Sequence, residues 1–165
     1  MSYARAVRID LARARTVVDQ AIAHARSNDF PPMTVAVLDA ARRLVAFAGE
    51  DGSSLLRERI ARGKAHGALN MGMGNRGLAA RAASNPAFVN ALVSLADGNL
   101  VPVPGGVLIR DDNDDLIGAV GVSGHIPDDD EAGAIHAITA GLRADPERLI
   151  QPDPAIPTNR LGDIS

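Results

Sequence analysis

Apolar side chains recur at helical spacing over the first thirty residues of the chain. The apolar positions are Val7, Leu11, Ala14, Val18, Ala21, Ile22 and Ala25, and arginines fill many of the positions between them. An apolar residue at every third or fourth position lines one face of a helix. The spacing therefore predicts an amphipathic helix over residues 4–26. We expect it to end before Pro31, because proline cannot continue a helix.

Two pairs of short apolar runs then predict two β-hairpins. The first pair covers residues 33–39 and 44–48, with a four-residue turn between them. The second pair covers residues 104–109 and 117–125, separated by the polar segment 110–115. Short runs rich in valine and isoleucine, bounded by polar turns, are typical of buried strands. Asp39 stands at a strand end, where its side chain is expected to hydrogen-bond the backbone of the turn.

Helical patterns fill the remaining sequence between and after the hairpins. One helix is predicted from residue 55 to about residue 71 with Ser54 as its N-cap, and a short one over residues 77–83. Another is expected to start at Ser84-Asn85-Pro86, and a last one to cover residues 127–143. The glycine-rich residues 71–75 predict a link between helices, since no Gly-Lys-Ser/Thr follows them as in a phosphate loop.

This order of elements predicts an α+β fold rather than a parallel doubly wound sheet. Two antiparallel hairpins alternate with helices, and no internal repeat or linker composition interrupts residues 1–144. We therefore expect one domain over residues 1–144. Residues 145–165 carry four prolines and are predicted to form a proline-rich C-terminal tail without regular structure.

Composition narrows the range of functions. Of the 165 residues, 46% are hydrophobic but only 2% aromatic, so the core must be built from Ala, Val, Leu and Ile. The net charge is −3 with no long basic run, which disfavours nucleic-acid binding. The absence of cysteine excludes disulfides and a thiolate nucleophile. No apolar stretch has transmembrane length and no signal-peptide core precedes the first helix, so we predict a cytoplasmic protein without a membrane partner.

The second hairpin is the candidate binding site. Five glycines there have no Cβ, so a ligand or another backbone can come close to Gly105, Gly106, Gly118, Gly121 and Gly124. We expect a ligand, and Gly106→Val is expected to spare the fold but abolish binding. Lys64 follows an apolar row on its helix, which predicts a lysine that snorkels to water or lies at a pocket rim. On a regular helix His66 faces away from Lys64.

The acidic residues 128–131 have a structural explanation and a chemical one. At the start of a predicted helix they favour its dipole, and this suffices for most of the cluster. A site for a hard metal ion is the alternative. We predict no metal site.

Four segments together resemble the GlcG/HbpS-type family, also described as haem-binding protein-like or adenosyltransferase C-terminal-domain-like. They are residues 35–39 with 44–47, residues 61–68 around Lys64-Ala65, residues 105–109, and residues 117–124. The resemblance covers residues 4–143. It implies a profilin-like antiparallel sheet flanked by helices, and homo-oligomers such as tetramers or octamers. It also implies either haem or tetrapyrrole binding or a lyase activity on hydroxylamino-aromatic acids.

The sequence is compatible with three functions. A small-molecule-binding protein would use His66, His125 or His136 as a neutral ligand to haem iron. A lyase acting on a small aromatic acid such as a hydroxylaminobenzoate would hold the carboxylate with Lys64 or with one of three arginines, Arg57, Arg59 or Arg62. In it, His125 would be general acid or base, and the amides of Gly105-Gly106 or Ser123-Gly124 would stabilise negative charge. A partner-binding adaptor is the third possibility.

Overall fold

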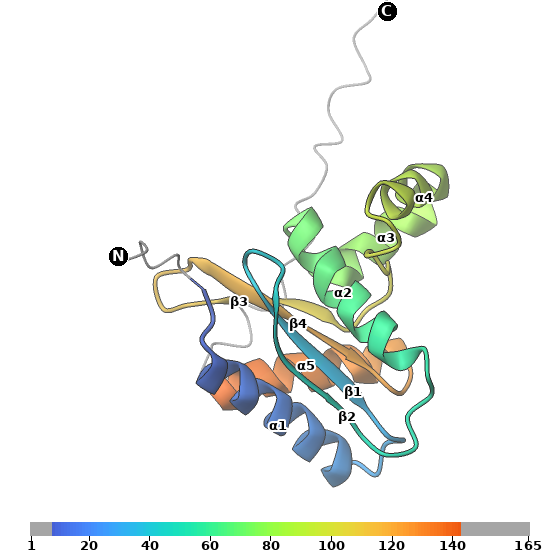
Figure 1. Ribbon diagram of the computed structural model, residues 1–165. Helices are drawn as coiled ribbons and strands as arrows, with labels where there is room; N and C mark the ends of the chain where they lie inside the picture. Colours follow the sequence, from blue (N-terminus) through green and yellow to red (C-terminus); the bar gives the residue numbers. More distant parts are fainter. Residues whose placement is uncertain (1–7, 143–165) are drawn as a thin grey trace, which may run out of the picture.

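The computed structural model describes residues 8–142, which form a four-stranded antiparallel sheet and five helices (Figure 1). The strands lie in the order β2-β1-β4-β3. The elements are α1 (Leu11–Ser27), β1 (Thr34–Asp39), β2 (Leu44–Gly49), α2 (Arg57–Met71), α3 (Asn75–Ser84), α4 (Pro86–Leu95), β3 (Gly106–Arg110), β4 (Leu116–Ser123) and α5 (Pro127–Leu142). The α+β class, the single domain and both antiparallel hairpins are confirmed.

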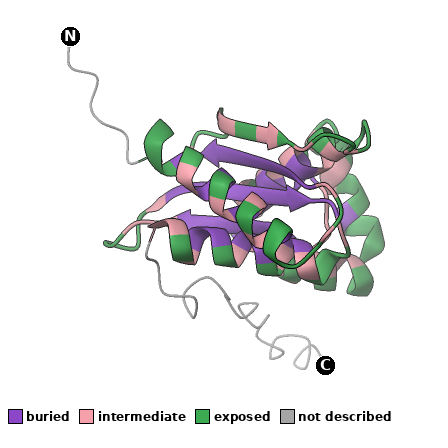
Figure 2. Cartoon of the chain, turned by 90° about the horizontal axis from the view of Figure 1, so that it is seen from below, coloured by how far each residue is buried: buried purple, intermediate pink, exposed green. Residues whose placement is uncertain are grey.

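Helices cover both faces of the sheet. On one face, α1 and α5 pack against a core that includes Val35, Val37 and Val120. On the other face, Ala65 and Ala68 of α2 pack on strand residues of β1, β3 and β4, and α3 and α4 stand beyond α2 (Figure 1). The buried residues are concentrated in the strands and on the inner sides of the helices (Figure 2). With so few aromatic residues available, small side chains let the layers pack closely.

Glycines in β4 set the distance between α2 and the sheet. A Cβ placed on Gly121 would overlap the carbonyl oxygen of Ala61 and lie 2.8 Å from the backbone nitrogen of Ala65. The backbone of α2 therefore rests directly on β4. This close contact places the side chains of α2 on either side of β4.

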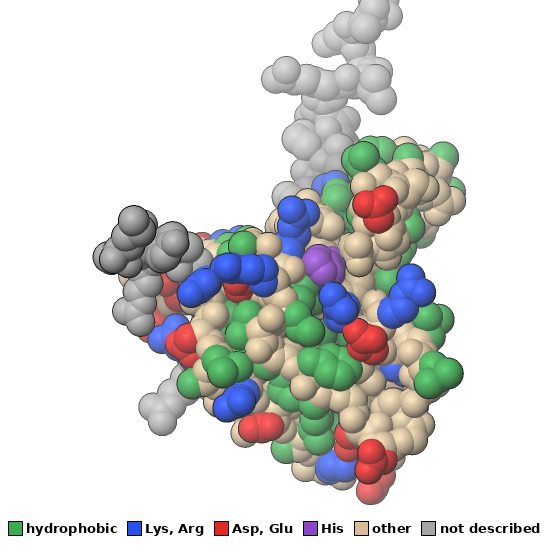
Figure 3. All heavy atoms as spheres, viewed as in Figure 1, with side chains coloured by type: hydrophobic (Ala, Val, Ile, Leu, Met, Phe, Trp, Pro, Cys, Tyr) green, Lys and Arg blue, Asp and Glu red, His purple; other side chains and the backbone are tan. Residues whose placement is uncertain are grey.

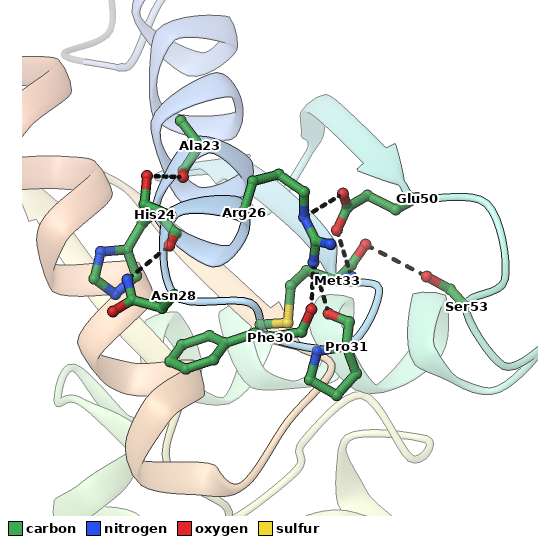
Figure 4. A network of polar contacts seen from close by, with 10 residues as sticks. Ala23, His24, Arg26, Asn28, Phe30, Pro31, Met33, Glu50 and Ser53 are labelled. Atoms are coloured by element: carbon green, nitrogen blue, oxygen red, sulfur yellow. Dashed lines mark hydrogen bonds and ion pairs between the residues drawn. The ribbon is translucent and has the colours of Figure 1, made fainter.

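A polar network holds the connection between α1 and β1 (Figure 4). The Arg26 guanidinium donates to the carbonyl oxygens of Phe30 and Pro31 and lies 3.0 Å from a carboxylate oxygen of Glu50. The second Glu50 oxygen accepts from the backbone N–H of Met33 at 2.7 Å. Because both ends of the loop are tied, the position of the Phe30 ring is fixed near the start of α5.

Most element boundaries agree with the sequence within a few residues. The helix predicted over residues 4–26 starts at Leu11, and its part before residue 8 lies outside the described residues, as does the tail 145–165. Asn85 caps α4 as predicted, its side chain accepting from the N–H of Phe88 at 3.2 Å. The N-cap predicted at Ser54 is wrong, because α2 begins after Leu56 with no side-chain cap.

Candidate functional site

Lys64 is buried in the centre of the molecule and forms an ion pair. Its side chain is 2% exposed, and its Nζ donates to Asp130 Oδ2 at 2.8 Å and to the carbonyl oxygen of Val122 at 2.9 Å. Burial lowers the pKa of Lys64, while the charge and hydrogen bond of Asp130 oppose that shift. The lysine therefore neither snorkels to water nor lies at a pocket rim, and the prediction about its exposure was wrong.

Asp130 connects three elements through its two carboxylate oxygens. Oδ2 accepts from Lys64 of α2, while Oδ1 accepts from the backbone N–H of His125, just after β4, at 2.9 Å. Asp130 itself lies in the first turn of α5 and is 1% exposed. The sequence could not reveal this partner, because the two residues are 66 positions apart.

The other acidic residues of this helix start also have partners within the protein. Arg76 of α3 donates to Asp128 and to Glu131, both at 2.6 Å, and these bonds raise the pKa of Arg76. Asp129 lies 3.4 Å from the imidazole of His125. Within residues 8–142, no group of three or more His, Asp or Glu side chains is arranged to hold a metal ion. The acidic cluster thus joins α5 to α2, α3 and the end of β4.

The glycines of the second hairpin accommodate protein atoms. A Cβ on Gly105, where φ is +117°, would lie 2.8 Å from Lys64 Nζ, and one on Gly106 would overlap the carbonyl oxygen of Lys64. A Cβ on Gly124 would overlap the sulfur of Met33. The space in front of these glycines is therefore filled by α2 and by Met33. This explains the glycines as packing residues and removes the reason to expect that Gly106→Val would spare the fold.

His125 and Ser123 lie at the same end of β4. The His125 ring is half-buried, with its centroid 5.0 Å from that of Phe30. The buried Ser123 hydroxyl accepts from Arg57 at 3.1 Å. The structure therefore brings together six of the predicted site residues, in what we call the lysine cluster: Lys64, Gly105, Gly106, Ser123, Gly124 and His125.

Two further histidines lie near His125, on the α1–α5 side of the sheet. The rings of His24 and His136 are tilted against each other with centroids 4.5 Å apart, and His24 also meets Phe30 edge-on. Burial and the neighbouring His136 lower the pKa of His24, while Asp129 opposes the shift. Three of the chain's four histidines are therefore grouped around Phe30.

His66 and Arg62 lie away from the lysine cluster, on the side of α2 near the turn that joins β1 to β2. His66 is half-buried, and burial, followed by the charges of Arg62 and Arg42, lowers its pKa. Arg62 bonds Glu58 at 3.0 Å on the helix surface. Arg42, from the turn between β1 and β2, donates to Asn70 of α2 at 2.9 Å. The sequence analysis missed Arg42, whose only signal is an arginine in a hairpin turn.

An exposed aromatic residue lies on the face of the sheet that α2 covers. Phe47 of β2 pairs with Ala36, which in turn pairs with Gly121, and Gly121 faces α2. Since paired residues share a face, Phe47 points to the α2 side of the sheet, where its side chain is 42% exposed. Hydrophobic side chains gather on this side of the molecule next to Lys and Arg side chains (Figure 3). Leu69 of α2 is partly buried and stands three positions after His66, on the same side of the helix. We call Arg42, Phe47, Arg62, His66 and Leu69 the α2–β2 face.

Comparison with known proteins identifies the family. The model of the haem degrading protein HbpS-like family matches residues 9–139, which is most of the chain. The chain belongs to the HbpS-like family. This confirms the resemblance that residues 35–39, 105–109 and 117–124 indicate. No curated protein sequence matches the chain.

Solved structures confirm the HbpS-like fold. The PduOC:haem complex is 24% identical, with 81% of this chain and 95% of that chain covered and a TM-score of 0.73. The ORFY protein of Klebsiella pneumoniae is 21% identical, with 88% and 99% covered and a TM-score of 0.76. A double mutant of HbpS from Streptomyces reticuli is 21% identical, with 84% and 90% covered and a TM-score of 0.73.

In residues 8–142 no helix has both the length and the apolar composition needed to cross a membrane.

Proposed function

We propose that the protein binds haem, or a related anionic tetrapyrrole, on the α2–β2 face. The observation that carries this proposal is the position of His66. Its imidazole is half-buried, its lowered pKa favours the neutral form, and it lies near the guanidinium groups of Arg62 and Arg42. Haem binding requires a neutral imidazole for the iron, cations for the propionates and an apolar surface for the ring.

The residues of the α2–β2 face fit these three requirements. His66 would hold the iron, and Arg62 with Arg42 would hold the two propionates. The surface pair between Arg62 and Glu58 is an exposed helical ion pair, which contributes little and can be exchanged for a propionate. Phe47 and Leu69 would contact the ring. Bound haem would supply redox-active iron, held by the His66 imidazole.

Membership of the HbpS-like family also supports the proposal that the protein binds haem. The matching family model is described as haem degrading, and PduOC, one of the structural neighbours, forms a haem complex. The comparisons support neither the lyase nor the adaptor interpretation. The catalytic roles predicted for Lys64 and His125 stay predictions, as do ligand contacts by Gly105, Gly106, Ser123 and Gly124. A cytoplasmic location also stays a prediction.

A second copy of the chain is the proposed protein partner. The helix α4 packs mainly against α3, and its side chains Phe88 and Leu95 are 46% and 81% exposed. Apolar side chains exposed at this level on a projecting helix are typical of an interface. We propose that the protein is a homo-oligomer, a tetramer or an octamer, as the family resemblance implied.

Haem titration of matched histidine variants tests the proposed site. The unmodified protein should give a saturable Soret shift with one haem per chain, and His66→Ala should lose that shift. Replacing both cations, as in Arg42→Gln with Arg62→Gln, should weaken binding at least about tenfold, because charge-assisted bonds to two propionates are lost.

His125→Ala is the control, since His125 is also half-buried but belongs to the lysine cluster. Its Soret shift and stoichiometry should equal those of the unmodified protein. Loss of the shift in His125→Ala together with full binding by His66→Ala would move the site to the lysine cluster and refute the proposal.

A further inference from the structure

A cavity lies between the start of α1 and the turn that joins β1 to β2. Its volume is about 720 Å³, and arginine, aspartate and aliphatic side chains line it together. None of the five residues of the α2–β2 face lines this cavity. It therefore shares no residue with the proposed haem site, although Arg42 and Arg43 are neighbours in the chain.

One arginine of the cavity is held in place by a buried carboxylate. Arg43 donates through Nε to Asp39 Oδ2 at 2.9 Å, and its Nη2 lies 2.8 Å from the same oxygen. The second Asp39 oxygen accepts from the backbone N–H groups of Ala41 and Arg43, at 2.9 and 3.0 Å. Burial tends to raise the pKa of Asp39, but the hydrogen bonds and charge of Arg43 outweigh it and lower the pKa. Asp39 therefore stays ionised and keeps the Arg43 guanidinium fixed.

Two more arginines give the cavity lining a net positive charge. Arg8 and Arg13 line it beside Arg43, and Asp10 and Asp39 are the two acidic residues. Three guanidinium charges against two carboxylates leave one net positive charge. Asp10 is also engaged, because one of its oxygens accepts from the backbone N–H of Arg13 as the N-cap of α1, and the other lies 3.7 Å from Arg13 Nε. Arg13, like Arg43, therefore already has an acidic neighbour, and the net charge of the lining remains positive. An anionic ligand would neutralise this net positive charge.

Aliphatic side chains supply the rest of the lining. Ile9 is buried and Val45 is partly buried, whereas Leu11 and Leu44 are 48% and 44% exposed. A bare inorganic anion would leave these leucines in water. An anion with an apolar body would cover them and contact the arginines at the same time.

We infer that this cavity is a second binding site, for a small organic anion that carries one carboxylate on an aromatic or short aliphatic body. The fixed Arg43 receives the carboxylate with little loss of side-chain freedom, since Asp39 has already ordered it. Arg8 and Arg13 add charge, and Leu11 and Leu44 cover the apolar body. The inference does not depend on haem binding.

Calorimetric titration of the full chain with benzoate tests this inference. We expect saturable binding with one benzoate per chain and a dissociation constant of about 1 mM, as suits a ligand of this size. Acetate has the charge without the ring, and benzyl alcohol has the ring without the charge. Both should bind at least about tenfold more weakly than benzoate.

Variants locate the binding. Arg8→Gln with Arg13→Gln should weaken benzoate binding about tenfold, while Arg15→Gln, an exposed α1 arginine outside the cavity lining, should leave it unchanged. Arg43→Lys keeps the charge but loses the paired N–H donors of the planar guanidinium. It should therefore weaken benzoate binding even where the variant folds normally.

Three results would overturn the inference: no saturable benzoate binding, equal binding of acetate, or full binding by the Arg8 and Arg13 double variant. Haem binding measured on the same double variant separates the two sites. A variant that loses benzoate but keeps its Soret shift supports the second site whether or not haem binds at His66. Loss of both ligands in a folded double variant would contradict the independence of the two sites.

Discussion

At the scale of single residues, the Lys64–Asp130 pair is the costliest polar contact to disturb. Both side chains are at most 2% exposed, so each charged group has lost its contact with water and interacts with the opposite charge instead. Removing one partner from a buried pair leaves an uncompensated charge, whereas replacing both by apolar residues is often tolerated. The pair therefore holds α2 and α5 in a defined relation even where it adds little net stability.

Asp130→Ala should lower the free energy of unfolding by about 3–5 kcal/mol, because Lys64 loses its partner and the N–H of His125 loses its acceptor. Urea unfolding measures this change. Asp128→Ala on the same helix turn is the control: its carboxylate is 72% exposed, so its loss should cost at most about 1 kcal/mol. Equal losses in the two variants would show that the buried pair is no more important than a surface pair.

At the scale of elements, the position of α2 depends on two glycines of neighbouring strands. Gly106 and Gly121 pair with each other across β3 and β4, and a Cβ on either would overlap a backbone oxygen of α2. Backbone cannot move aside as a flexible side chain can. The sequence predicted that a ligand or another backbone comes close to these glycines, and the structure places the backbone of α2 there. A glycine has the same appearance in a sequence whether a ligand or a helix lies over it.

Gly121→Ala should therefore destabilise the protein by about 1–3 kcal/mol or more, as expected for an overpacked core. Gly74→Ala provides the comparison, because a Cβ there would only reach ordinary contact with the carbonyl oxygen of Gly106 at 3.7 Å. Gly74 is the N-cap of α3, where alanine is less favourable than glycine, so we expect that variant to lower the unfolding free energy by at most about 1 kcal/mol. Thermal and urea unfolding of both variants measure this difference in stability. A Gly121→Ala protein as stable as Gly74→Ala would refute the explanation that Gly121 is needed for the packing of α2.

Across the whole molecule, local patterns predicted the elements but not how the site residues meet. The period of apolar residues located both hairpins and most helices, because burial of one face dictates that period. The partner of Lys64 lies 66 positions away, and only the folded chain brings Asp130 to it. The separation of His66 from Lys64 was predicted from helix geometry, but only the folded chain brings Arg42, from the turn between β1 and β2, close to His66.

Self-association is the prediction that concerns the molecule as a whole. Light scattering coupled to size-exclusion chromatography should give a mass four or eight times that of the 17.1 kDa chain. Phe88→Ser with Leu95→Ser should reduce this mass, because both side chains are exposed on α4, which projects from the sheet (Figure 1). Leu11→Ser, an equally apolar change at an exposed position of α1, should keep the mass of the unmodified protein. A monomer mass for the unmodified chain at micromolar concentration would refute self-association, and an unchanged mass in the α4 variant would place the interface elsewhere.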